Sequence, residues 1–198
     1  MAATGVIRIS DEARHYALEE LCRRAGLRDP DALRWRIDPQ QTGLALRRVD
    51  GHGGIAFPRA VGELNREIAV RKAWLIPITV SPESAVQDFI VPFCSLESKS
   101  GQPLFIETAP GEFQCTEDLL ASTALVLSRF EELGAERRDQ HGRFSSTESI
   151  AVRDGYLDRP IVDEWGLALE QVIAALQPGF RAERKLRVKI SHDVDLSG

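Results

Sequence analysis

The spacing of apolar residues changes twice along the chain, and this change restricts the fold more than any other feature. Residues 10–26 repeat at helical spacing, residues 33–107 form short β-rich runs, and residues 116–134 and 160–176 return to helical spacing. The strands and the three helices alternate irregularly, without the repeated spacing of β-α-β units. The sequence therefore predicts an α+β domain with a mixed or antiparallel sheet and about three main helices.

Short runs of β-branched and aromatic residues between turn signals predict the strands. We expect strands at Trp35–Ile37, Leu44–Val49, Ile55–Phe57 and Leu104–Glu107, with further β-rich stretches at Val70–Val80 and Phe89–Phe93. Asp38-Pro39 and Asp50–Gly54 are the expected turns. The glycines of the second turn also suggest a phosphate loop, but it lacks the Gly-Lys-Ser/Thr ending, so a hairpin is favoured.

Capping residues predict where the helices begin and end. Ser10 is suited to cap the first helix and Gly26 to end it. Thr116 and Gly134 are the expected limits of the second helix. The third helix is expected to begin near Pro160 and to stop before Pro178, after a polar loop at 135–158. Phe144 and Trp165 are expected to fill the core.

Composition excludes several classes of function. The chain has 198 residues, of which 43% are hydrophobic, which is enough for one substantial core. A net charge of −5 argues against an extended nucleic-acid surface. The sequence predicts no membrane span and no secretory signal, so we expect a cytoplasmic protein. Cys22, Cys94 and Cys115 form no CxxC pair and are expected to be small buried hydrophobes.

The last residues carry the strongest chemical signal. Leu186, Val188 and Ile190 alternate with basic residues, which predicts a half-buried strand. This strand leads directly into His192, Asp193 and Asp195, whose side chains can transfer protons or bind a metal. We expect these groups to open an active site whose other residues are not part of this chain.

Four segments of the sequence resemble a known arrangement. Leu125–Glu132, Arg138–Phe144 and Gly155–Trp165 are similar to an uncharacterised domain that precedes the catalytic domain of certain bacterial polysaccharide deacetylase-like proteins. In those proteins a strand ending in His-Asp-Val-Asp follows, as Lys189–Asp195 does here. The resemblance implies an accessory domain over residues 1–182. It also implies a linker and the first strand of a NodB-type (β/α) barrel over residues 183–198.

The resemblance also implies roles for the terminal residues. Such barrels belong to carbohydrate esterase family 4 and hydrolyse N-acetyl groups on polysaccharides with a divalent metal, for which zinc is the expected ion. Asp193 would be the general base and Asp195 a metal ligand. The family's His-x-x-x-His ligands have no counterpart among His15, His52, His141 and His192. We therefore expect this chain alone to hold no metal and to be inactive, with its own downstream barrel and a polysaccharide as partners.

A polar cluster inside the accessory domain has two interpretations. Its members, together with Glu131, could bind a carbohydrate or phosphate, or they could anchor the loop that follows the second helix, which we favour. They are Arg129, Glu132, Asp139, His141 and Arg143.

Two further functions are alternatives to the deacetylase interpretation. The domain could be a glycan-binding or partner-binding module without chemistry of its own. Less favoured is a metal-dependent nuclease of the restriction type, in which Asp88 and Glu97 would hold the metal and Lys99 would steady a water.

Overall fold

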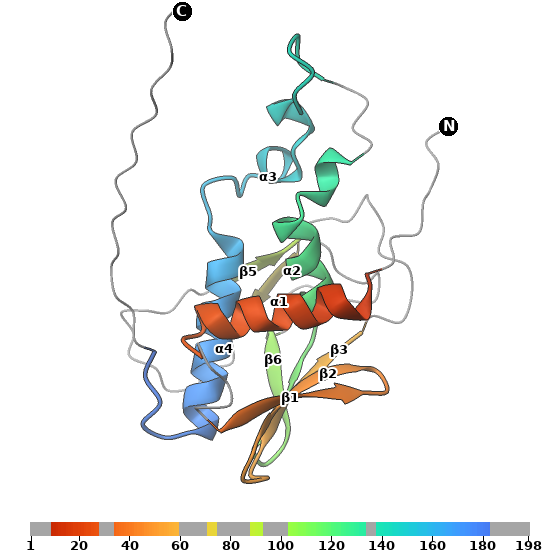
Figure 1. Cartoon of the computed structure of the whole chain (residues 1–198). Coiled ribbons are helices and arrows are strands. Elements are labelled where there is room, and N and C mark those ends of the chain that lie inside the picture. The colour runs from red at the N-terminus through yellow and green to blue at the C-terminus, as the bar shows by residue number, and fades with distance from the viewer. Residues whose placement is uncertain are drawn as a thin grey trace, which may run out of the picture.

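A computed structural model describes residues 9–27, 34–59, 71–74, 88–92, 103–133 and 138–182. Its main sheet has five strands, and a separate pair of strands lies beside it (Figure 1). The elements, in chain order, are α1 (Asp11–Arg24), β1 (Trp35–Gln40), β2 (Gly43–Arg48), β3 (Gly54–Pro58), β4 (Arg71–Trp74), β5 (Asp88–Val91), β6 (Phe105–Ala109), β7 (Glu112–Cys115), α2 (Leu119–Leu127), α3 (Ile150–Arg153) and α4 (Ile161–Leu176). The described residues also form two 3-10 turns, Phe130–Glu132 before the predicted polar loop and Ser146–Glu148 within it. α3 lies in the same segment, so the sequence analysis was wrong to expect no helix there.

The five-stranded sheet is mixed, with the strand order β1-β2-β3-β7-β6. β1, β2 and β3 form an antiparallel meander, and β7 joins it by pairing in parallel with β3. β6 then pairs antiparallel with β7. Helices and a mixed sheet in this order confirm the predicted α+β class, and residues 49–53 form the predicted hairpin turn between β2 and β3.

Two local predictions for the sheet were wrong. Asp38 and Pro39 are not a turn but belong to β1, where they pair with Ala45 and Leu44. Proline is tolerated there because β1 is an edge strand. β7 was not predicted at all, because a four-residue strand between a turn and a helix gives only a short alternation signal.

The predicted starts of α1 and α4 were right, whereas both predicted limits of α2 were wrong. α1 is capped as expected, since the Ser10 hydroxyl accepts a hydrogen bond from the Ala13 N–H at 3.2 Å. α2 is capped by Asp118 rather than by Thr116, whose hydroxyl donates to the Pro103 carbonyl at 2.7 Å. α2 also ends at Leu127, several residues before the predicted stop. α4 starts directly after Pro160, as predicted.

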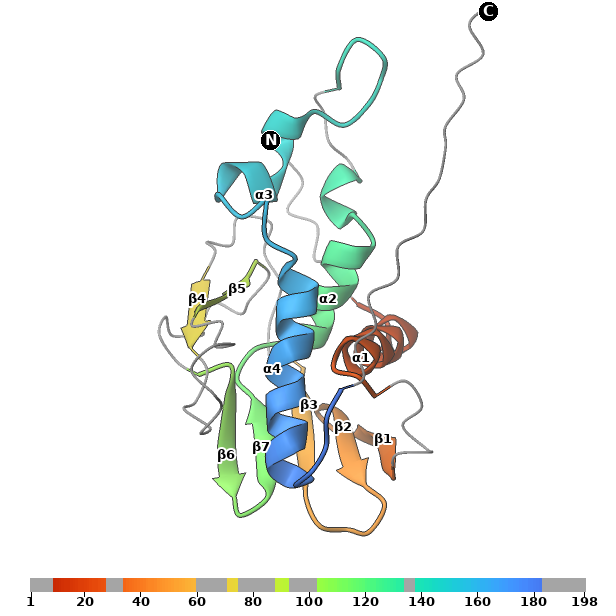
Figure 2. The same cartoon turned by 90° about the vertical axis from the view of Figure 1, so that its left-hand side faces the viewer.

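One hydrophobic core joins α1, the five-stranded sheet, α2 and α4. Figure 2 shows α4 running alongside the strands, with α1 crossing beside it. Phe57 and Phe105 meet edge to face with ring centroids 6.0 Å apart. Trp165 is fully buried, as predicted, and its indole N–H donates to the Ile90 carbonyl at 3.0 Å. Phe144 is only half-buried, in the polar loop.

Two of the three cysteines lie in this core. Cys22 and Cys115 are free and buried, as predicted, whereas Cys94 lies outside the described residues. Burial raises the pKa of the Cys22 thiol to about 12 and also raises the pKa of Cys115. Both thiols therefore stay protonated at neutral pH and act as small apolar groups. Among the described helices, none has the length and apolar character that crossing a bilayer requires.

Candidate functional site

The polar cluster predicted from the sequence divides into two separate groups. Arg129 follows α2 in the left-handed conformation, with φ of 52°, and its guanidinium forms an ion pair with Glu132. The Arg129 side chain is 75% exposed. Because the left-handed conformation is costly for a residue with a Cβ, this pair and the contacts of the next turn must hold the chain in its bend.

The second group is a closed turn around Asp139. Its carboxylate accepts hydrogen bonds from the backbone N–H groups of His141 (2.8 Å) and Arg143 (2.9 Å) and from the Arg143 guanidinium (2.7 Å). The Arg143 backbone N–H, followed by its side chain, lowers the pKa of Asp139. Asp139 is thus an ionised turn anchor, and the His141 and Arg143 side chains lie on the exposed surface.

Glu131 connects this region to the rest of the loop. Its carboxylate accepts hydrogen bonds from the Ser149 hydroxyl at 3.1 Å and from the Ile150 N–H at 2.7 Å, at the start of α3. Arg138 donates to the Glu132 carbonyl at 3.1 Å. These pairings support the loop-anchoring interpretation of the cluster, while a binding role for it stays a prediction.

Most of the other candidate site residues lie outside the described part of the chain. His192, Asp193, Asp195, Glu97 and Lys99 lie outside the described residues, and so does the predicted barrel strand within 183–198. Asp88 is the first residue of β5 and pairs with Trp74 of β4. Within the part of the chain that the structure describes, no group of three or more histidine, cysteine or acidic side chains is arranged to hold a metal.

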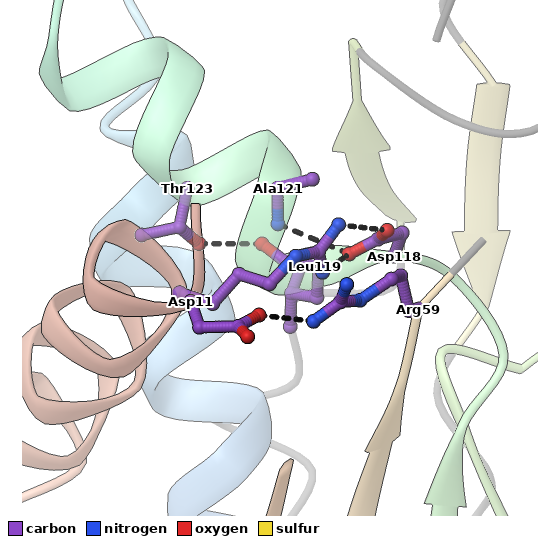
Figure 3. A network of polar contacts seen from close by, with 7 residues as sticks. Asp11, Arg59, Asp118, Leu119, Ala121 and Thr123 are labelled. Atoms are coloured by element: carbon purple, nitrogen blue, oxygen red, sulfur yellow. Dashed lines mark hydrogen bonds and ion pairs between the residues drawn. The ribbon is translucent and has the colours of Figure 1, made fainter. Parts of the chain in front are cut away.

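A buried ion pair between two helices is the feature that the sequence analysis missed. Arg14 of α1 donates to both carboxylate oxygens of Asp118, at 2.6 and 2.8 Å (Figure 3). The two side chains are only 5% and 1% exposed. Arg14 precedes Ala17, Leu18 and Leu21 at helical spacing, so its place on the core-facing stripe was a signal that the sequence contained.

Asp118 has a second role in the same network. Its Oδ1 atom accepts the Ala121 N–H at 3.1 Å and so caps α2. Thr123 donates to the Leu119 carbonyl at 2.7 Å within the same helix, and nearby Asp11 forms an ion pair with Arg59 (Figure 3). Because the Asp118 carboxylate accepts hydrogen bonds from Arg14 and from the start of α2, it serves as a clamp between α1 and α2.

The chain that leaves α4 is also clamped. The Trp35 indole N–H donates to the Gln177 side-chain oxygen at 2.9 Å, and the Arg48 guanidinium donates to the Leu176 carbonyl. Beyond this point Ala182 lies against Gly26, whose φ is +91°. A Cβ at Gly26 would lie 2.8 Å from the Ala182 Cα, so only glycine allows this approach. Residues 176–182 therefore form an exit clamp against α1, β1 and β2.

A groove of about 540 Å³ opens between α1 and the tip of the β1–β2 hairpin. Its lining combines aromatic, apolar and charged side chains. It lies on elements that precede the polar loop and shares no lining residue with the Arg129–Arg143 cluster.

One protein family matches more than half of the chain. Residues 63–178 match the family described as a family of unknown function, DUF7033. The chain belongs to this family. The DUF7033 match covers β4 to β7 and α2 to α4. α1 and β1 to β3 precede the matched residues, but their buried side chains belong to the same hydrophobic core. No curated protein and no solved structure matches the chain.

Proposed function

We propose that residues 1–182 are a non-catalytic accessory domain that holds the first strand of a metal-dependent polysaccharide deacetylase. The observation that carries this proposal is the exit clamp. Residues 176–182 are fixed by Trp35, Arg48 and Gly26, so that the segment bearing His192, Asp193 and Asp195 continues from a defined point. Such a point would orient a following catalytic domain relative to this one.

The terminal residues supply part of the chemistry that amide hydrolysis needs. Imidazole and carboxylate groups are the ligands that zinc accepts, so His192, Asp193 and Asp195 suit such a site in donor type. A bound divalent metal supplies Lewis-acid activation of a carbonyl and of water. In this proposal Asp195 would help to hold the metal, and Asp193 would be the group that accepts a proton from water.

The same proposal covers location and partners. The accessory domain acts in the cytoplasm, on a polysaccharide or a precursor of one, beside its own downstream barrel. The net charge of −5 supports a partner other than nucleic acid.

The test uses the chain extended by its own downstream coding sequence. Release of acetate from N-acetylglucosamine oligomers is measured with zinc present. The extended protein is expected to be active, and Asp193→Asn and Asp195→Asn are each expected to lower kcat by about a hundredfold or more. Full activity in the Asp193→Asn variant, or an extended protein that never releases acetate, would contradict the proposal.

A pair of glycine variants tests the clamp in the same assay. Gly26→Ala forces overlap with Ala182, whereas Gly51→Ala has a comparable φ of +77° but nothing within 4 Å. Both variants carry the cost of a left-handed residue, so their difference reports the clamp. We expect activity to fall in the Gly26 variant and to be retained in the Gly51 variant. Equal activities would show that the exit clamp does not orient the catalytic segment.

A further inference from the structure

The groove beside α1 is lined by one stripe of that helix. Asp11, Glu12, His15, Tyr16 and Glu19 recur at the spacing of one helical face. Asp11 and Glu19 lie two turns apart, which is about 12 Å along the helix axis. The opposite wall comes from the β1–β2 hairpin, where Pro39 and Leu44 pair directly across the strands.

The groove combines an open aromatic ring with an apolar wall. Tyr16 is 54% exposed although it lies on a helix that packs closely on its other side. Large aromatic side chains with an exposed ring and a hydroxyl are characteristic of binding surfaces. Pro39 and Leu44 supply the apolar surface opposite this ring.

Two contacts join polar side chains that line the groove. Arg59 pairs with Asp11, and His15 lies 3.5 Å from Glu19. Glu12 completes the lining, and hydrogen bonds from its own backbone N–H and from the Ser10 side chain lower its pKa. The lining thus has three carboxylates against one guanidinium, which disfavours an anionic ligand and offers hydrogen-bond acceptors and donors.

We propose that this groove binds a neutral oligosaccharide. A sugar ring offers an apolar C–H face to Tyr16 and hydroxyl groups to the carboxylates and to Arg59. The two-turn length of the groove suits a short chain of such rings rather than a single one. This inference goes beyond the proposed function, because binding here uses only residues 11–59 and needs no downstream catalytic segment.

The experiment measures binding by the 198-residue chain. Neutral tetrasaccharides of glucose, mannose, galactose and N-acetylglucosamine are titrated by calorimetry, and the contacted amides are mapped by NMR. At least one probe is expected to bind with shifts on α1 and the β1–β2 hairpin. Tyr16→Ala is expected to weaken that binding about tenfold or more, whereas Tyr16→Phe keeps most of it.

Two controls make the result decisive. Val49→Ala removes an apolar side chain of similar exposure, 57%, outside the groove lining, and is expected to leave the affinity unchanged. An anionic uronic-acid tetrasaccharide is expected not to bind. The proposal is overturned if no neutral probe binds, if only the anionic probe binds, or if Tyr16→Ala matches the wild-type affinity. None of these outcomes depends on acetate release, so this proposal and the deacetylase proposal can fail independently.

Discussion

Arg14 and Asp118 show how one pair of charged side chains can be tolerated in a core. Removing two charges from water is costly, and only good geometry offsets that cost. Here the Asp118 carboxylate accepts two parallel hydrogen bonds from the Arg14 guanidinium and a third from the Ala121 N–H. The pair therefore fixes the position of α1 relative to α2 more than it adds net stability.

Removing one partner of this pair should be far more harmful than removing an exposed ion pair. Arg14→Ala leaves Asp118 buried without its counter-charge, and we expect a loss of about 3–5 kcal/mol in the free energy of unfolding. Arg36→Ala, which breaks the pair of Arg36 with Asp38 where Arg36 is 60% exposed, should cost about 1 kcal/mol or less. Urea unfolding followed by circular dichroism measures both. Similar losses in the two variants would show that breaking the buried pair costs no more unfolding free energy than breaking the exposed one.

At the scale of elements, α1 and α4 approach each other closely at Gly166. A Cβ at Gly166 of α4 would lie 2.5 Å from the Cβ of Arg24 and 3.1 Å from its carbonyl carbon. Glycine in a helix interior is unfavourable by about 1 kcal/mol relative to alanine, so its presence here requires a compensating benefit. That benefit is the close crossing of the two helices.

The Gly166→Ala variant tests this explanation. Helix propensity alone predicts a gain of about 1 kcal/mol in stability, but the overlap with Arg24 predicts a loss that exceeds it. We expect a lower thermal midpoint than that of the unaltered protein. A second variant, Gly166→Ala with Arg24→Gly, removes the overlapping side chain and should recover part of the loss. An increase in the midpoint for Gly166→Ala alone would contradict the close-packing account.

The sequence predicted elements well where local signals are strong and poorly where distant contacts decide. The Ser10 cap and the regular stripe of α4 depend on neighbouring residues, and both were found. α2 stops at Leu127 without a glycine, and the residue that then bends the chain with φ of 52° is Arg129, whose type gives no signal for the end of a helix. β7 was missed because its four residues give only a short alternation signal, and nothing local to it indicates its pairing with β3.

The candidate site shows the same division. The local turn around Asp139 could be anticipated, since aspartate often binds backbone groups a few residues ahead. The groove could not be anticipated, because it lies between a face of α1 and the tip of the β1–β2 hairpin, which only the tertiary structure brings together. The Arg14–Asp118 pair could be anticipated only in part. The position of Arg14 on the core-facing stripe of its helix was a signal, but nothing in the sequence indicated that Asp118, 104 residues away, is its partner.

At the scale of the whole molecule, the family match and the folding unit differ. DUF7033 spans residues 63–178, but Trp35, Ile55 and Phe57 are buried in the same core as Trp165. A protein cut to residues 63–178 would lack α1 and would leave the β3-facing edge of β7 unpaired.

We therefore expect the fragment 63–178 to lack a cooperative unfolding transition and to associate. Fluorescence of Trp165 during urea unfolding and light scattering measure the two properties, with the 198-residue chain as the control. A fragment that unfolds cooperatively as a monomer would show that α1 and the β1–β3 meander are an addition to the core rather than part of it.

The parallel pairing of β3 with β7 has a consequence for synthesis of the protein. α1 and β1 to β3 are synthesised long before residues 112–118. During that interval the edge of β3 that pairs with β7 is open, and Arg14 lacks the Asp118 carboxylate. The meander can form early, because its contacts are local. Completion of the core must wait for β7 and α2, and the open edge of β3 is the place where a nascent chain would need protection.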